Sequence, residues 1–146
     1  GYSKYAMDQI AYRYIKENPE MTIVGLKFFN VYGAREFYKN TTSSMVIQLG
    51  HQILSGKTPR LFDGSDKILR DFVNIDDVIQ ANIKACTPKQ NGVYNVGTGE
   101  PRSFQDKADI RDSEKYLEYK PEITLEQGIK AYVAEIRQLF KEEIQP

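Results

Sequence analysis

The chain has 146 residues, of which 40% are hydrophobic and 27% charged, values that are ordinary for a globular protein. Twenty basic residues balance twenty acidic ones, which excludes an overall positive field that would attract nucleic acid or anionic lipid. Cys86 is the single cysteine, so an internal disulfide is excluded, and we expect this side chain in the core. No apolar run approaches the ~20 residues of a membrane span, and we expect a cytoplasmic protein.

The first predicted elements are a helix over residues 2–17 and a strand over residues 22–29. The helix is indicated by apolar side chains that recur on one side at helical spacing, and the strand by an apolar run. Polar residues follow the strand from Asn30 onwards. Ligands of an open α/β sheet bind in the crevice outside the carboxyl ends of its strands, so we expect the functional site to begin at Asn30.

A polar link over residues 39–43 precedes a predicted helix over residues 44–54. The spacing predicts one polar stripe on this helix, formed by Ser44, Gln48, His51 and Ser55. Residues 58–65 are typical of an edge segment closed by an Asp-Gly turn. A strand over 72–75, a helix over 76–85 and a strand over 93–96 complete this part of the chain.

The last part of the chain is less regular. Residues 103–106 look like the opening turn of a helix, but a different pattern begins at Lys107, so we expect a missing segment between Asp106 and Lys107. Thr124 and Gln127 occupy capping-box positions at the start of a long final helix. Three strands would leave one edge and one face of a sheet uncovered. We therefore expect the chain to be a fragment of a larger protein.

Two lysines each have two interpretations. Lys4, on the flank of the apolar side of the first helix, is either an ordinary surface lysine or a ligand for ribose hydroxyls that lowers the pKa of a neighbouring phenol. Lys39 is either a solvated loop lysine or a general acid/base, a role that burial or a nearby cation favours. Arg35, four residues earlier, is a candidate for that cation.

His51 and Arg70 also allow two interpretations. His51 is the only histidine, and it is either structural or a hydrogen-bonding group for a polyhydroxylated ligand; its neighbours in sequence do not have metal-ligand spacing. Arg70 either pairs with the adjacent Asp71 or grips a phosphate in bidentate fashion.

These features occur in an order that resembles a known family. Ser3-Lys4 on a helix, Phe29-Asn30-Val31-Tyr32-Gly33 after a strand, Arg70-Asp71-Phe72-Val73 and Tyr94-Asn95-Val96-Gly97-Thr98-Gly99 resemble the second half of the extended short-chain dehydrogenase/reductase family of nucleotide-sugar enzymes. Within it, residues 35–36, Lys39 and residues 41–45, 61–65 and 108–110 look most like the ADP-heptose 6-epimerases.

The resemblance implies an α/β fold: the C-terminal part of a Rossmann-like, doubly wound parallel sheet plus a small α/β substrate-binding domain. Residues 1–33 would end the nucleotide-binding domain, residues 34–70 would be a substrate-binding insertion, residues 71–99 would return to the sheet and residues 100–146 would form a C-terminal substrate domain. A homo-oligomer is also implied, with no nucleic-acid or membrane partner.

The implied activity is inversion of C6 of an ADP-heptose for lipopolysaccharide supply, with NADP oxidising C6 to a ketone and reducing it again. Two acid/base groups serve the two epimers: the tyrosine of a Tyr-x-x-x-Lys motif, whose lysine corresponds to Lys4, and Lys39. By resemblance, Lys4 and Val31 contact NADP. The residues implied to contact ADP-heptose are Asn30, Ser44, His51, Phe62, Asp63, Gly64, Ser65 and Arg70.

The sequence departs from the family at two catalytic features. Four residues before Lys4 lies the position preceding Gly1, so the motif tyrosine is not in this sequence, and the glycine-rich nucleotide-binding turn is also absent. We therefore expect the isolated chain to be inactive. The alternatives are another enzyme of the family, such as a UDP-hexose 4-epimerase or a dehydratase, and a noncatalytic ligand-binding fragment.

Overall fold

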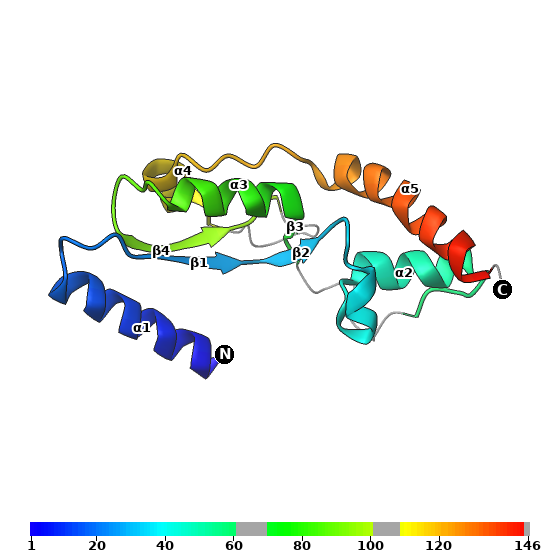
Figure 1. Ribbon diagram of the computed structural model, residues 1–146, viewed down its shortest axis with the longest axis horizontal. Helices are drawn as coiled ribbons and strands as arrows, with labels where there is room; N and C mark the ends of the chain where they lie inside the picture. Colours follow the sequence, from blue (N-terminus) through cyan, green and yellow to red (C-terminus); the bar gives the residue numbers. More distant parts are fainter. Residues whose placement is uncertain (61–69, 101–108, 145–146) are drawn as a thin grey trace.

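A computed structural model describes residues 1–60, 70–100 and 109–144. Helices and short parallel strands alternate along this part of the chain, which confirms the predicted α/β class (Figure 1). In chain order the elements are α1 (Tyr2–Glu17), β1 (Val24–Phe28), β2 (Asn30–Tyr32), the 3-10 helix η1 (Phe37–Thr42), α2 (Met45–Leu54), β3 (Phe72–Asn74), α3 (Ile75–Ala85), β4 (Gly92–Val96), α4 (Arg111–Leu117) and α5 (Leu125–Ile144). No helix of the described residues is long and apolar enough to cross a membrane.

The strand predicted over residues 22–29 is in fact the first of two strands, β1 and β2, which pair with different partners. β1 pairs in parallel with β4, and β2 pairs in parallel with β3. The partner changes between Phe29, whose N–H donates to the carbonyl of Val96 (3.1 Å), and Asn30, whose N–H donates to the carbonyl of Asp71 (3.0 Å). Asn30 therefore begins a strand rather than following the end of one, and the chain leaves the strand at Gly33.

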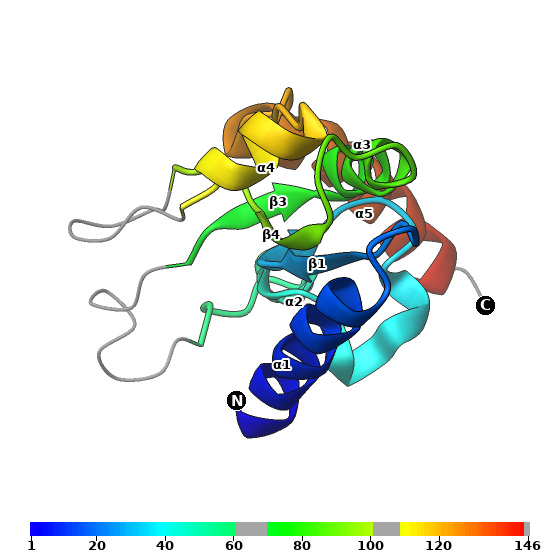
Figure 2. The same ribbon diagram turned by 90° about the vertical axis from the view of Figure 1, so that its left-hand side faces the viewer.

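One face of the β1–β4 pair carries a well-buried core. Tyr94 and Val96 of β4 pack with Ala81 of α3 and with Leu117 and Tyr119 around α4, all at most 3% exposed. Figures 1 and 2 show α3 and α4 on this side of the strands and α1 on the other. α4 was not predicted, because its seven residues are too few to establish a helical period.

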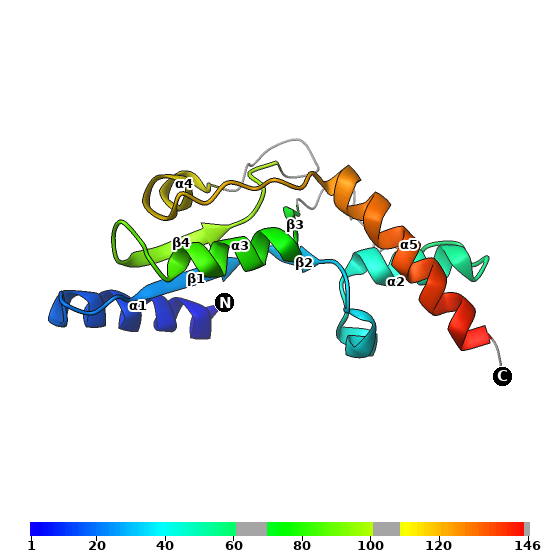
Figure 3. The same ribbon diagram turned by 45° about the horizontal axis from the view of Figure 1, so that its top comes forward.

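A second core joins α2, α5 and the β2–β3 pair. Its buried members are Tyr32, Ile47, Tyr132 and Ile136. α5 lies so close to β2 that a side chain at Gly128 would meet the Tyr32 hydroxyl oxygen at 1.9 Å, so only glycine fits there. Figure 3 shows α5 and α2 together at the end of the molecule where the C-terminus lies.

The predicted capping box at the start of α5 is confirmed. The Thr124 N–H donates to Oε1 of Gln127 (3.0 Å), and the Gln127 N–H donates to Oγ1 of Thr124 (3.3 Å). These reciprocal bonds satisfy two of the backbone donors that a helix start leaves unpaired.

Three local predictions were wrong. The link over residues 39–43 is largely part of η1. On α2 the helical spacing predicts an apolar side formed by Met45, Val46, Leu49 and Ile53. The buried residue is instead Ile47, and Ile53 is 60% exposed. Cys86 is exposed rather than in the core because it follows the last turn of α3, where its thiol donates to the carbonyl of Asn82 (3.5 Å).

Candidate functional site

A pocket of about 500 Å³ lies at the carboxyl end of β2. This is the position at which parallel α/β sheets bind ligands. Two of the predicted functional residues, Val31 and Lys39, line it. The complete lining is Val31, Gly33, Ala34, Arg35, Glu36, Lys39, Ile75, Asp76 and Ile79.

The chain reaches Lys39 through two unusual backbone conformations. Gly33 has a φ of 141°, and the β-carbon of a larger residue there would lie 2.6 Å from Cγ2 of Ile75. Arg35 has a φ of 68°, which costs a non-glycine residue about 1–2 kcal/mol. Its N–H donates to Oε1 of Glu135 on α5 (2.8 Å), which fixes this conformation.

The backbone of Lys39 is held on both sides. Its N–H donates to the carbonyl of Glu36 (2.9 Å), and its carbonyl accepts from the Thr42 hydroxyl (2.7 Å). The side chain itself is exposed and lines the pocket, together with the cationic Arg35 and the acidic Asp76. The position of Lys39 suits a group that exchanges protons with a ligand in this pocket.

Glu36 is a buried carboxylate whose role the sequence did not predict. It is 6% exposed and accepts hydrogen bonds from the N–H of Ser44 (2.7 Å), the Ser44 hydroxyl (2.7 Å) and the Tyr132 hydroxyl (3.4 Å). Burial, followed by the Glu36 charge, raises the pKa of Tyr132, so this phenol stays protonated and donates. The sequence offers only a glutamate in a charged loop as a signal.

None of the predicted substrate residues that the structure describes lines this pocket. Asn30 uses its side-chain amide to donate to the carbonyl of Asp71 (3.0 Å), and Ser44 donates to Glu36. His51 is half-buried on α2, and Arg70 is exposed just before β3. Phe62, Asp63, Gly64 and Ser65 lie outside the described residues.

Lys4 lies apart from the pocket residues in the sequence and in the fold. It is exposed in the first turn of α1, on the opposite side of the strands from α3. It does not line the pocket at β2. Its predicted contact with a cofactor therefore stays a prediction.

Asp71 holds the turn after β4 rather than serving only as a neighbour of Arg70. Its buried carboxylate accepts from the N–H and the hydroxyl of Thr98 (3.0 and 2.6 Å) and from the N–H of Gly99 (2.9 Å). These bonds tie the start of β3 to the end of β4. The Asp71 carboxylate therefore holds the Gly97-Thr98-Gly99 turn in place.

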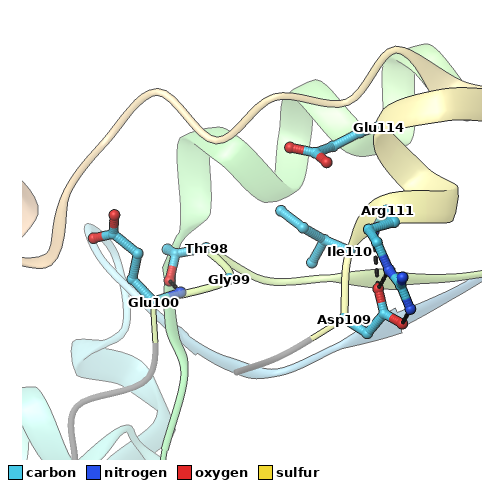
Figure 4. A pocket seen from close by; sticks show the side chains of 7 residues that line it. All are labelled: Thr98, Gly99, Glu100, Asp109, Ile110, Arg111 and Glu114. Carbon is cyan, nitrogen blue, oxygen red and sulfur yellow. Dashed lines mark hydrogen bonds and ion pairs between the residues drawn. The ribbon is translucent and has the colours of Figure 1, made fainter. Parts of the chain in front are cut away.

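A second pocket, of about 580 Å³, lies beside this turn (Figure 4). Its lining residues are Thr98, Gly99, Glu100, Asp109, Ile110, Arg111 and Glu114. On one wall Arg111 grips Asp109 through two hydrogen bonds (2.8 and 2.7 Å), which lower the pKa of Asp109 to about 2. Because the Arg111 guanidinium is already paired with Asp109, this wall is less suited to binding an anion than an unpaired arginine would be.

Comparison with known proteins identifies relatives of this fold. The model of the NAD dependent epimerase/dehydratase family matches residues 1–97. The ADP-L-glycero-D-manno-heptose-6-epimerase of Helicobacter pylori is 39% identical with a TM-score of 0.82, covering 94% of this chain and 50% of that one. A Bacillus cereus UDP-glucuronic acid 4-epimerase, solved with NAD, is 28% identical with a TM-score of 0.75, covering 96% and 52%.

The fold extends to more distant enzymes. The UDP-glucose 4-epimerase of Thermotoga maritima, solved with UDP-glucose, has a TM-score of 0.82 at 23% identity, covering 96% of this chain and 53% of that one. The chain therefore spans about half the length of these solved structures. Since the family model matches well over half of its residues, the chain belongs to the NAD dependent epimerase/dehydratase family.

Proposed function

We propose that this chain is the substrate-side half of an NADP-dependent ADP-L-glycero-D-manno-heptose 6-epimerase, which inverts C6 of ADP-D-glycero-D-manno-heptose for lipopolysaccharide synthesis in the cytoplasm. The observation that carries the proposal is the pocket at β2, in which Val31 and Lys39 share one lining. The 39% identity to the Helicobacter pylori enzyme supports the choice of sugar.

The pocket suits a nicotinamide ring beside a sugar hydroxyl. Val31, Ile75 and Ile79 provide an apolar wall, and Lys39 provides an amine at the same pocket. When bound, the cofactor would supply the hydride acceptor and donor for C6. The phosphates of the cofactor are expected to be held by a glycine-rich turn that this sequence does not contain.

Lys39 would act as the acid/base for one epimer. Its neutral amine would take the proton of the C6 hydroxyl as the C–H bond breaks and the C6 ketone forms. In the reverse direction its ammonium would return a proton to the C6 oxygen. A proton moved by a positioned side chain accelerates such a step by roughly 10²–10⁴-fold.

The test is the Lys39→Met variant of the longer protein of which this chain would be the second half. We expect interconversion of the two ADP-heptose epimers, followed by NMR, to slow by roughly 10²-fold or more. Lys57→Met is the matched control, because Lys57 is an exposed lysine beyond α2. Equal rates in the two variants would refute the role of Lys39, and binding of ADP-heptose without turnover in the unmodified protein would favour a noncatalytic module.

A UDP-sugar 4-epimerase is the second candidate, because the Bacillus cereus 4-epimerase matches nearly the whole chain. The same longer protein assayed with UDP-glucuronic acid and UDP-glucose separates the two. A kcat/KM for either UDP-sugar above that for ADP-heptose would replace the proposed substrate.

Arg70 is the proposed partner of the substrate diphosphate. It is exposed and directly precedes Asp71, whose bonds to the turn after β4 fix the backbone at this point. An arginine held in this way can bind phosphate in bidentate fashion. Asn30, Ser44, His51 and residues 62–65 remain the other proposed substrate contacts.

A further inference from the structure

Lys39 lies in a segment that is fastened to the C-terminal helix. We define the α5 latch as Glu36, Ser44 and Tyr132, together with the bond from Arg35 to Glu135. Through it, the segment between β2 and α2 is bonded to two side chains of α5, Tyr132 and Glu135. About 100 residues separate the two parts in sequence.

The centre of the latch is the buried Glu36 carboxylate. A buried carboxylate is costly unless hydrogen bonds compensate for the water it has lost. Here three donors do so, and two of them belong to Ser44, the residue that precedes the first turn of α2. The positive N-terminal end of the α2 dipole also stabilises this carboxylate. The Ser44 hydroxyl does not cap its own helix, and Glu36 caps the start of α2 in its place.

The latch sets the position of Lys39 because Glu36 directly precedes η1 and Lys39 lies in the first turn of that helix. The Lys39 N–H is bonded to the carbonyl of the same Glu36 whose side chain is anchored. A displacement of Glu36 would therefore carry the Lys39 backbone with it. Misplacement of a reacting group by about 1 Å can cost up to 10²-fold in rate.

We infer that Glu36 and Tyr132 are positioning residues for Lys39. Through these two residues, α5 sets the geometry of the proton-transfer site. This inference rests on the proposed function in that Lys39 is taken as the acid/base. Neither residue needs to touch the substrate to act in this way.

The test uses Tyr132→Phe in the same longer protein, because phenylalanine keeps the ring in the core and removes only the hydroxyl. We expect kcat for heptose epimerisation to fall about tenfold with KM changed less than about twofold, since alignment and not binding is altered. We also expect amide hydrogen exchange in residues 36–44 to become about tenfold faster. Glu36→Gln, which preserves shape and removes the charge, is expected to shift both readouts in the same direction.

The matched control is Tyr119→Phe. Tyr119 is also a buried tyrosine with a hydroxyl donor, which bonds to the carbonyl of Gly97 (2.9 Å), but it belongs to the other core. If Tyr132→Phe and Tyr119→Phe show the same kcat and the same exchange over residues 36–44, the inference is overturned. If the unmodified protein does not epimerise ADP-heptose but Tyr132→Phe alone accelerates this exchange, the proposed reaction fails while the latch stands.

Discussion

The two faces of the β1–β4 pair differ in how much of the chain they bury. Val24, Leu26, Tyr94 and Val96 face α3 and α4 and belong to one core. The other face carries α1, which has no buried residue, and its Met7, Ile10 and Tyr14 are 68%, 50% and 51% exposed. Burial is the main source of folding free energy, so this comparison teaches that α3 and α4 stabilise the strands while α1 adds little.

The largest effect expected from this comparison is that of removing a buried side chain of α4. Leu117→Ala should lower the free energy of unfolding by about 3 kcal/mol, because it leaves a cavity at a position only 3% exposed. Ile10→Ala on α1 is the matched control and should change it by less than about 0.5 kcal/mol. Urea unfolding measures both, and similar losses would show that the two faces are equally important.

A pH-dependent effect of intermediate size is expected from Tyr119 on the same core. Burial, then the charges of Asp77 and Asp71, raise the pKa of Tyr119. The unfolded chain therefore loses this proton first, at about pH 10. The contribution of Tyr119 to stability should be constant below that pH and should fall by up to about 1.4 kcal/mol per pH unit above it.

Urea unfolding between about pH 9 and pH 11.5 tests this dependence. Tyr119→Phe removes the titrating group and should give a flatter profile. Three other buried tyrosines, whose pKa values burial also raises, will keep part of the slope: Tyr32, Tyr94 and Tyr132. Parallel profiles for the two proteins would contradict the role of Tyr119.

The smallest effect is expected for the ion pair that joins α1 to β1. Asp8 and Lys27 are 3.3 Å apart, with 22% and 46% of their side chains exposed. Asp8→Asn should cost about 0.5 kcal/mol or less, and the difference from the unmodified protein should shrink in 1 M salt, where the Debye length is only about 3 Å. A loss above about 2 kcal/mol would mean that α1 is held far more tightly than its exposure indicates.

The sequence predicted the elements that local patterns specify. The helix over residues 2–17 and the capping box at Thr124 and Gln127 depend on neighbours within a few positions, and both are present. The division between β1 and β2 was missed because nothing local marks it. It depends on Val96 and Asp71, which lie more than 40 residues away from the two amides they bind.

The candidate site shows the same distinction. Val31 and Lys39 line one pocket, as the segment that follows a parallel strand would suggest, while their functional roles stay predictions. Glu36 was overlooked because a glutamate in a charged loop is usually solvated. Its burial arises only when α5, about 96 residues later, brings Tyr132 to it.

The change of partner at Phe29 has an evolutionary consequence. The stretch from Val24 to Tyr32 sets the pairing of both β4 and β3, and its side chains alternate between Leu26 in the core and Lys27 beside α1. One inserted residue would turn Lys27 towards the core and shift every pair beyond it. Alignment gaps among relatives should therefore be confined to the surface loops, which tolerate changes in length.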